Sequence, residues 1–327
     1  MAASRVVRVA AVQLDCIPNG GERNRANADV WIAQAAGQGA QLVLLPEMMP
    51  GGYLLSEDIW DSAEPAGRGP SLAWLRDTAR RHGIHLGMSL LEAEGEDFYN
   101  AFYLATPDGG IAGRVRKQPP ASVEAYLTRA GDDSHVIDTA LGRIGVGICY
   151  ENLLHCRMAE LHAASVDLVL QPTSAPAPAP GFPIRRKDSQ SFGDFLAAGP
   201  GRYARALGVP VVMANKSGRL VTDLPATFPS QDTVFPGRSQ IVDGDGRVQA
   251  EMGAEEGVIV ADVTLDPTRK VAATPPSHGR WSMPVPWYGF LWPLTQWTGQ
   301  RAYAANERRK KKARAVAGLE SGISRTP

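Results

Sequence analysis

The stretch from residue 142 to residue 149 constrains the fold of this chain more than any other. It reads Gly-Arg-Ile-Gly-Val-Gly-Ile-Cys, and the alternation of glycine with branched apolar residues is typical of a buried strand. This strand ends at a single cysteine, Cys149, shortly before a predicted helix over residues 154–165. Because buried cysteine often serves as a small apolar residue, Cys149 taken alone is more readily a core residue than a nucleophile.

Strands and helices alternate along most of the chain. Residues 6–14 alternate as a strand does, residues 24–37 have the pattern of an amphipathic helix, and residues 41–46 are a continuous apolar run that ends in Pro-Glu. This order predicts sheets covered by helices in one α/β or α+β domain. Similar patterns predict helices over residues 71–82 and 201–207, and strands over residues 85–92, 100–105, 113–117, 135–139, 167–171, 210–215, 239–242, 247–251 and 257–263.

Residues 173–201 interrupt this order. Residues 173–183 contain four prolines, most of them interleaved with alanine, and residues 182–201 add charges, glycine and three phenylalanines. Proline cannot donate a hydrogen bond to a sheet, so no strand is expected here. We expect a long surface loop, which either forms a wall of a pocket or is a plain linker.

The C-terminal residues 276–327 differ in composition from the rest. Aromatic residues and prolines crowd residues 281–297, and five consecutive cations follow at residues 308–312. This arm could lie in a membrane interface, with its basic run near anionic headgroups. We favour an arm that packs on the body or on a second subunit, with the basic run solvated, because interfaces are also rich in aromatic residues. The expected division is a body of residues 1–275 and an arm of residues 276–327.

Composition excludes several classes of function. Lys plus Arg and Asp plus Glu number 34 each, so no field of the whole protein would attract nucleic acid. Three cysteines are too few for a disulfide framework, which suits a reducing compartment, and we expect a cytoplasmic protein. No stretch reaches the roughly 18 apolar residues that a membrane span requires.

Two acids and a lysine lie, like Cys149, at or shortly after the end of a predicted strand. Glu47 directly follows an apolar strand, Lys117 ends another, and Glu124 comes seven residues later. Taken singly, each is more readily a turn acid, a solvated lysine or an acid at the start of a helix. Ligand sites gather at strand ends in sheets that helices cover, so the four together predict one site. A desolvated carboxyl group suits a general base, and a fixed ammonium group suits an oxyanion.

In this order the residues resemble the nitrilase superfamily of carbon-nitrogen hydrolases, on its amidase-like side. The likeness covers roughly residues 6–266 and leaves out the arm. Its motifs are Arg8-Val-Ala-Ala-Val-Gln-Leu, Leu44-Leu-Pro-Glu47, Arg116-Lys117 with Glu124, Gly147-Ile-Cys149-Tyr-Glu151, residues 201–207 with 211–215, and the late hairpin of residues 235–246.

The resemblance implies a four-layer αββα sandwich that forms a homodimer or a higher homo-oligomer through the helices next to the nucleophile. It also implies that Cys149 is the nucleophile, Glu47 the general base, Lys117 the oxyanion stabiliser and Glu124 a second acid that positions them. No cofactor and no metal are expected. His155 and His162 lie seven residues apart, without further ligands beside them.

The expected substrate is a small amide or nitrile. Family members that bind a carboxylate often carry an arginine just after the cysteine, where this chain has Asn152-Leu-Leu, so the acyl portion should be neutral and partly apolar; a helix could still bring Arg157 back to the site. Cys149-Tyr-Glu and Asn215-x-x-Gly218 favour an amidase, whereas the spacing from Lys117 to Glu124 favours a nitrilase. A hydrolase of N-carbamoyl compounds is a further alternative, and a silent binding protein is the least favoured. We assign five residues to substrate binding: Tyr53, Tyr150, Glu151, Asn152 and Thr173.

Overall fold

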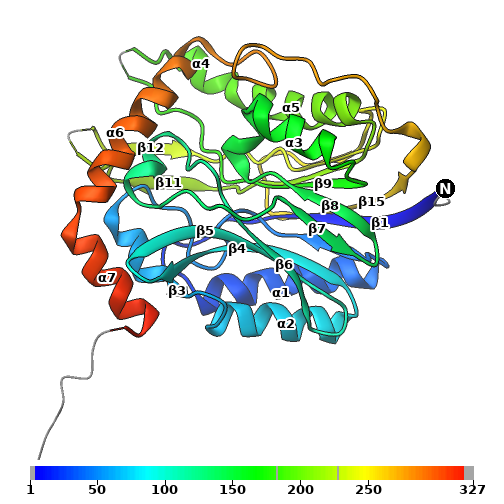
Figure 1. Cartoon of the computed structure of the whole chain (residues 1–327), viewed down its shortest axis with the longest axis horizontal. Coiled ribbons are helices and arrows are strands. Elements are labelled where there is room, and N and C mark those ends of the chain that lie inside the picture. Colours follow the sequence, from blue (N-terminus) through cyan, green and yellow to red (C-terminus); the bar gives the residue numbers. More distant parts are fainter. Residues whose placement is uncertain (1–3, 182, 227, 320–327) are drawn as a thin grey trace, which may run out of the picture.

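The computed structural model describes residues 4–181, 183–226 and 228–319. Phe182 in the predicted loop and the outermost residues of the predicted body and arm, 1–3 and 320–327, lie outside the described residues. Two large sheets stack face to face with helices on their outer faces, and the arm lies along one side of the molecule (Figure 1).

The first sheet is built from both ends of the body. Its strand order is β15-β1-β2-β4-β5-β6, with β3 paired to β4. Antiparallel pairing of β1 with β15 runs from Arg5 opposite Leu265 to Gln13 opposite Gly257, so the end of the body is joined to its start. The strands are β1 (Arg5–Gln13), β2 (Leu42–Leu44), β3 (Glu64–Pro65), β4 (His85–Glu94), β5 (Asp97–Ala105), β6 (Ile111–Arg116) and β15 (Gly257–Leu265).

The second sheet carries the cysteine strand near one edge. Its order is β14-β13-β10-β9-β8-β7, and the central strands β8, β9 and β10 run parallel. The strands are β7 (Val136–Thr139), β8 (Gly142–Val146), β9 (Leu168–Pro172), β10 (Val211–Ala214), β13 (Gln240–Val242) and β14 (Val248–Glu251).

Alternate residues of β1 show how the layers pack. Val9 and Ala11 enter the core between the two sheets, together with Val146 and Leu170 of the second sheet. Ala10 and Val12 point the other way, into the core under α1 (Glu22–Gly37) and α2 (Pro70–His82). Side chains of α3 (His155–Ala163) and α5 (Phe192–Leu207) cover the outer face of the second sheet. Since successive side chains of a strand face opposite sides, both sheets are buried on both faces, and the expected four-layer αββα sandwich is confirmed.

The predicted loop of residues 173–201 is wrong in its second half. Helix α4 (Arg186–Gln190) lies within it, and α5 begins at Phe192 instead of residue 201. Pro200 lies inside this helix, where a proline removes a helical hydrogen bond. Phe192 packs with Ala175 and Ala177, and this tertiary contact outweighs the cost of the proline. The hairpin of β11 (Arg219–Thr222) and β12 (Gln231–Val234) was not predicted from the sequence either.

The arm packs on the body through helices that the sequence analysis did not predict. A 3-10 turn, η5 (Trp287–Phe290), leads into α6 (Leu291–Ala305) and α7 (Glu307–Ala317). Helix α6 lies against η2 (Ser122–Tyr126), the turn that carries Glu124. A Cβ on Gly299 would lie 2.7 Å from the Tyr126 ring, so the helix can approach this closely only with glycine there.

The expectation that the basic run is solvated is wrong for Arg309, and two other residues of the run pair with acids of the body. Arg309 is buried and bonds to Asp97 at 2.6 Å. Arg308 pairs with Glu57 at 2.9 Å and Lys312 with Asp61 at 2.7 Å, because acids of the body face α7. Among the helices of the described residues, none has the length and apolar character needed to cross a membrane.

Candidate active site

Cys149 lies in a strained turn directly after β8. It begins the 3-10 helix η3 (Cys149–Leu153) with a φ of 53°, in the left-handed region that residues other than glycine seldom occupy. The amide of Asn152 holds this turn, donating hydrogen bonds to the carbonyl oxygens of Gly147 at 2.7 Å and Cys149 at 3.1 Å. A Cβ on Gly147 would lie 2.0 Å from the Asn152 side chain. Gly147 therefore makes room for Asn152, which holds the turn that carries Cys149.

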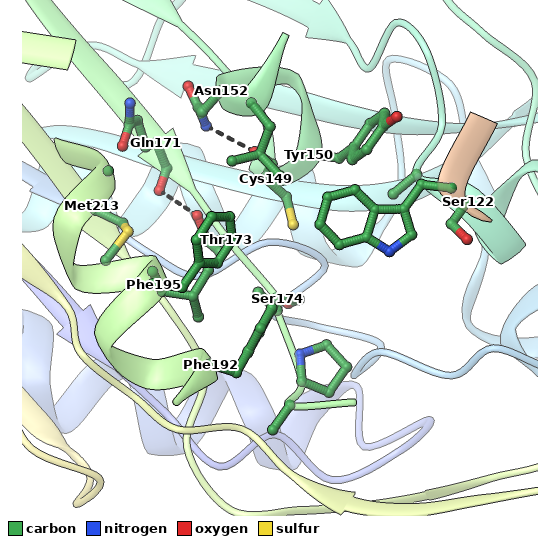
Figure 2. A pocket seen from close by; sticks show the side chains of 18 of the residues that line it. Ser122, Cys149, Tyr150, Asn152, Gln171, Thr173, Ser174, Phe192, Phe195 and Met213 are labelled. Carbon is green, nitrogen blue, oxygen red and sulfur yellow. Dashed lines mark hydrogen bonds between the residues drawn. The ribbon is translucent and has the colours of Figure 1, made fainter. Parts of the chain in front are cut away.

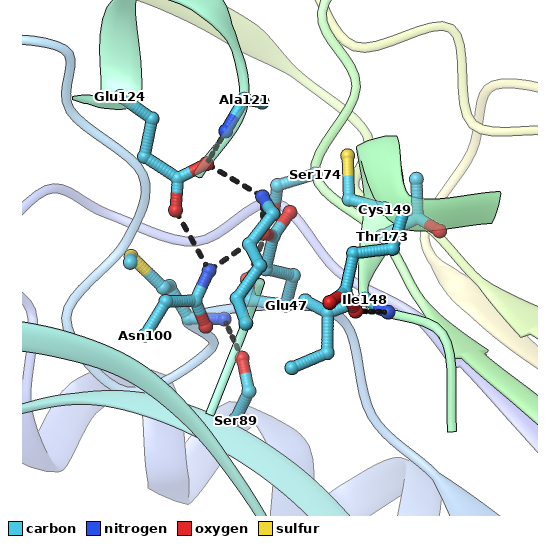
Figure 3. Close-up of polar contacts among 12 residues, drawn as sticks. Glu47, Ser89, Asn100, Ala121, Glu124, Ile148, Cys149, Thr173 and Ser174 are labelled. Carbon is cyan, nitrogen blue, oxygen red and sulfur yellow. Dashed lines mark hydrogen bonds and ion pairs between the residues drawn. The ribbon is translucent and has the colours of Figure 1, made fainter. Parts of the chain in front are cut away.

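Lys117 lies between the two predicted acids. Its Nζ is 2.6 Å from Glu47 Oε1 and 2.5 Å from Glu124 Oε2, and all three side chains are buried (Figure 3). Glu47 comes from the bend after β2, Lys117 from the end of β6, and Glu124 from η2. The structure thus brings Glu47 together with Lys117 and Glu124, which come from a later part of the chain, beside Cys149.

Asn100 is a member of this cluster that the sequence analysis missed. Its Nδ2 donates to Glu47 Oε1 at 2.7 Å and to Glu124 Oε1 at 3.0 Å (Figure 3). A single amide in the otherwise apolar run of β5 was the only signal in the sequence. By bridging the two carboxylates, Asn100 fixes their separation around Lys117.

Burial and charge set the protonation states of the site. Burial raises the pKa of the Glu47 carboxyl above its ordinary 4.5, and the attraction of Lys117 only partly opposes this effect. Burial also raises the pKa of the Cys149 thiol, and the negative charge of Glu47 adds to the rise. Burial opposes the charge on Lys117, but Glu124 and Glu47 outweigh it and raise the pKa of the ammonium group. At neutral pH the cysteine is therefore a thiol, with the Glu47 carboxyl group beside it.

One oxygen of Glu47 remains available. Its Oε1 accepts from both Lys117 and Asn100, while its buried Oε2 has no hydrogen-bond partner among the described residues. A buried acceptor without a partner is costly in a folded protein. This atom can receive a proton without breaking an existing bond.

The side chain of Glu151 forms a second buried cluster. It bonds to His135 Nε2 at 2.7 Å and accepts from Arg157 Nη2 at 3.3 Å. It also accepts from the backbone N–H of Gln118 at 2.6 Å and of Ile148 at 2.6 Å, so it links the residue after Lys117 to the residue before Cys149. Burial alone would raise the pKa of this carboxyl, but His135 and Arg157 outweigh burial and lower it.

A cavity of about 250 Å³ opens at Cys149 (Figure 2). Four of the residues that we assigned to substrate binding line it: Tyr53, Tyr150, Asn152 and Thr173. Glu151 does not line it, and neither does Arg157, whose guanidinium is engaged by Glu151 and Glu160.

Most of the cavity lining is apolar or aromatic. Within the described part of the chain, Arg202 is the one lining residue with a formal charge, and it is exposed. The predicted loop contributes Ala175, Pro176 and Phe192, so it forms a wall of a pocket, as one of the two interpretations held. In the same described residues, no group of three or more His, Cys, Asp or Glu side chains is arranged to hold a metal ion.

Sequence relatives of this chain include nitrilases and amidases. Nitrilase 1 of Arabidopsis thaliana is 32% identical over 193 residues, which are 53% of this chain and 56% of the relative. Nitrilase 3 of the same plant is 27% identical over 80% of both chains. N-carbamoylputrescine amidase of Solanum lycopersicum is 26% identical over 80% of this chain and 88% of the relative.

Solved structures share the fold. A carbon-nitrogen hydrolase of Helicobacter pylori G27 superimposes with a TM-score of 0.71 at 19% identity, covering 81% of this chain and 91% of the other. An amidase of Nesterenkonia AN1 superimposes with a TM-score of 0.64 at 25% identity, over 78% of this chain and 90% of the other. The sequence model of the carbon-nitrogen hydrolase family matches residues 8–273. This chain therefore belongs to the carbon-nitrogen hydrolases of the nitrilase superfamily.

Proposed function

We propose that this protein is a thiol-dependent amidase that releases ammonia or an amine from a neutral, partly apolar amide. The observation that carries the proposal is the convergence of Glu47, Lys117 and Glu124 in one buried cluster beside Cys149, which itself lines an apolar cavity. In mutant forms of the Nesterenkonia amidase, the acetamide moiety of fluoroacetamide adds covalently at the active-site cysteine, which supports a cysteine nucleophile here.

In the first half of the reaction, Glu47 takes the proton of the Cys149 thiol as the sulfur attacks the carbonyl carbon. An ammonium group has three N–H donors, and two of those on Lys117 are held by Glu47 and Glu124. The third is free to stabilise the negative oxygen of the tetrahedral intermediate, together with a backbone N–H after Cys149. Glu47 then gives its proton to the departing nitrogen, and a thioester remains on the sulfur.

In the second half, Glu47 takes a proton from water, whose oxygen attacks the thioester carbon. The carbon–sulfur bond breaks, the acid product leaves, and the proton returns to Cys149. One carboxyl group acts as base, acid and base again, which requires a raised pKa such as burial gives Glu47. Glu124 and Asn100 hold Lys117 and Glu47 in place throughout.

A nitrilase, which converts a nitrile into an acid, is the second candidate. The 32% identity to Nitrilase 1 and the spacing from Lys117 to Glu124 favour it. Hydrolysis of an N-carbamoyl compound is supported by the N-carbamoylputrescine amidase relatives. The same four residues would serve each reaction, so the substrate decides among them.

The test is ammonia release from aliphatic and aromatic amides, the matched nitriles and N-carbamoyl amino acids. We expect turnover of amides by the wild type and by Cys156→Ala, a control that removes an exposed cysteine, and no turnover by Cys149→Ala. Activity that survives in Cys149→Ala would overturn the mechanism. Release from nitriles but not amides would make the protein a nitrilase. Silence on every compound, with Cys149 also inert to iodoacetamide, would favour a binding protein without catalysis.

A further inference from the structure

The C-terminal arm supplies part of the cavity wall. Met283, Tyr288 and Trp292 line the cavity together with Cys149. Met283 and Tyr288 are buried, and Trp292 is half-buried. The family match ends at residue 273, so this wall lies outside the part of the chain that matches the family model. The arm therefore adds a surface for which the shared fold does not account.

Aromatic contacts couple this wall to the residue next to the nucleophile. The Trp292 ring meets the Tyr150 ring edge to face, with centroids 6.0 Å apart and planes at 85°. Tyr288 packs against Trp292 in the same manner at 6.0 Å, and Trp281 meets both Tyr150 and Trp292. Edge-to-face packing is a favoured arrangement of aromatic rings, so the wall has a defined shape.

Hydrogen bonds fix the arm at several points around the cavity. The Ser282 backbone N–H donates to the Leu153 carbonyl oxygen at 2.8 Å, and the Ser282 hydroxyl donates to the Asn152 carbonyl oxygen at 2.7 Å. Further along, Thr295 Oγ1 lies 2.6 Å from Ser122 Oγ, on the turn that carries Glu124. A wall held in place before the substrate arrives selects by shape, because it does not have to be ordered on binding.

A second aromatic wall comes from α5. Phe192 and Phe195 lie with ring centroids 5.8 Å apart, and both line the cavity. In the view of Figure 2 they lie on the other side of the Cys149 sulfur from Tyr150. An apolar cavity of about 150 Å³ is enough to bind benzene, so the 250 Å³ here accepts one ring with a short linker to the carbonyl group.

From this geometry we propose that the arm determines specificity, with Trp292, Tyr288 and Met283 selecting a neutral acyl group that carries one aromatic ring. The inference rests on the proposed function, since it names the acyl group that the thioester would hold. A short aliphatic acyl group reaches Cys149 but leaves both aromatic walls without contacts. Discrimination should therefore reside in the arm, and the chemistry in the body.

The test compares kcat/KM for phenylacetamide and acetamide in the wild type, Trp292→Ala and Trp297→Ala. Trp297 is on the same helix with 52% of its surface exposed and does not line the cavity, so its variant is a matched control. We expect the wild type to prefer phenylacetamide, Trp292→Ala to lose about 10- to 200-fold of that preference, and Trp297→Ala to keep it. A wild-type preference for acetamide, or an unchanged ratio in Trp292→Ala, would overturn the inference.

Two further measurements keep the inference separate from folding and from the proposed function. Met283→Trp fills the cavity instead of enlarging it, and we expect it to lose phenylacetamide turnover while it keeps acetamide turnover; equal loss of both would count against the arm as a selective wall. Calorimetry with Cys149→Ala measures the binding of phenylacetamide without chemistry. The double variant Cys149→Ala with Trp292→Ala should bind phenylacetamide about tenfold more weakly, or weaker still. If binding behaves so and no amide is turned over by the wild type, the amidase proposal fails and the specificity of the arm stands. If amides are turned over and Trp292→Ala leaves phenylacetamide binding unchanged, the amidase proposal stands and the proposed role of the arm in specificity fails.

Discussion

Glu47 and Glu151 are both fully buried glutamates that bond to a basic side chain, yet their environments shift the carboxyl pKa in opposite directions. The pKa of Glu47 is raised and that of Glu151 is lowered. Glu151 Oε1 bonds to His135, Arg157 and a backbone N–H, and its Oε2 accepts from another N–H. Glu47 Oε2 has no such partner in the described residues. The comparison shows that burial alone does not decide the direction of a carboxyl pKa shift, because the hydrogen-bond donors and positive charges around the group can outweigh burial.

The two carboxylates differ because their backbones do. Glu47 lies in a bend after β2, where the N–H of Glu47 donates to the Thr173 carbonyl oxygen at 3.3 Å and the N–H of Met48 to Ser89 Oγ at 2.7 Å, so neither serves the carboxylate. Glu151 lies in the first turn of η3, where the free N–H of Ile148 is within reach of its side chain. One carboxylate therefore keeps an oxygen without a partner among the described residues, while the other joins the loops that carry Lys117 and Cys149.

Of the variants considered, Glu47→Gln should cause the largest loss, and the loss should be in catalytic rate. A glutamine cannot take the proton of Cys149, and loss of a general base typically costs about 10²- to 10⁴-fold in rate. The raised pKa of Glu47 means that its ionised form is disfavoured in the folded state, and Lys117 keeps Glu124 as a buried partner, so the neutral variant should lose less stability at pH 7 than Glu151→Gln does. Steady-state kinetics and urea unfolding check both parts. Near-normal turnover of amides by this variant would contradict the role of Glu47.

Glu151→Gln should differ from Glu47→Gln, because its main effect should be a loss of folding stability. Removing one partner from a buried charge cluster typically costs about 3–5 kcal/mol, and here it leaves the Arg157 guanidinium without its buried partner. Because the pKa of Glu151 is lowered in the folded state, its contribution is present above pH 4.5 and is lost as the pH falls through the folded-state pKa. Urea unfolding at pH 7 and at lower pH measures the change.

Glu160→Gln is the control for that measurement. Glu160 pairs with the same Arg157, but 46% of its side chain is exposed, and exposed pairs contribute about 0–1 kcal/mol. If the two variants lost equal stability, the buried cluster around Glu151 would contribute no more to the free energy of unfolding than an exposed ion pair does. Glu151 and Glu47 would then differ only in their effect on catalysis.

The sequence was informative where a local pattern carried the constraint. Apolar runs predicted most strands of the two sheets, and polar residues at the strand ends identified Glu47, Lys117 and Cys149. Asn100 escaped because its partners come from a distant bend and a distant turn, which no local pattern encodes. Glu151 looked like a substrate ligand because it is close to Cys149 in sequence, but its side chain bonds to the Lys117 loop instead of lining the cavity.

The arm and α5 escaped for a different reason. The prolines of residues 173–201 argued only against a strand, and the early start of α5 depends on the packing of Phe192 in the folded chain. The helices of the arm are likewise held by contacts with η2 and with acids of the body. Propensity is a weak guide wherever tertiary contacts supply most of the stability.

Asn100→Leu should give the smallest effect and the finest test of how Glu47 is tuned. The acid limb of kcat/KM is expected above pH 4.5 in the wild type, because the base form of Glu47 disappears as the pH falls through its raised pKa. The hydrogen bond from Asn100 stabilises the carboxylate and lowers that pKa. A hydrogen bond to a charged group contributes about 1.5–3 kcal/mol, and each pKa unit is 1.36 kcal/mol, so the variant should move the acid limb upward by about one to two units.

A pH–rate profile of this variant separates tuning from simple damage. Asn27→Leu removes an amide that bonds to Glu256 away from the cavity, and it should leave the limb in place. A uniform drop in rate at every pH would mean that Asn100 only supports the fold around the cluster. A limb that moves downward would mean that Lys117, and not Asn100, sets the balance at Glu47, since loss of the amide would then have drawn the ammonium group closer. An upward shift with most of the plateau rate retained would identify Asn100 as the positioning residue that keeps the free oxygen of Glu47 a carboxylate at neutral pH.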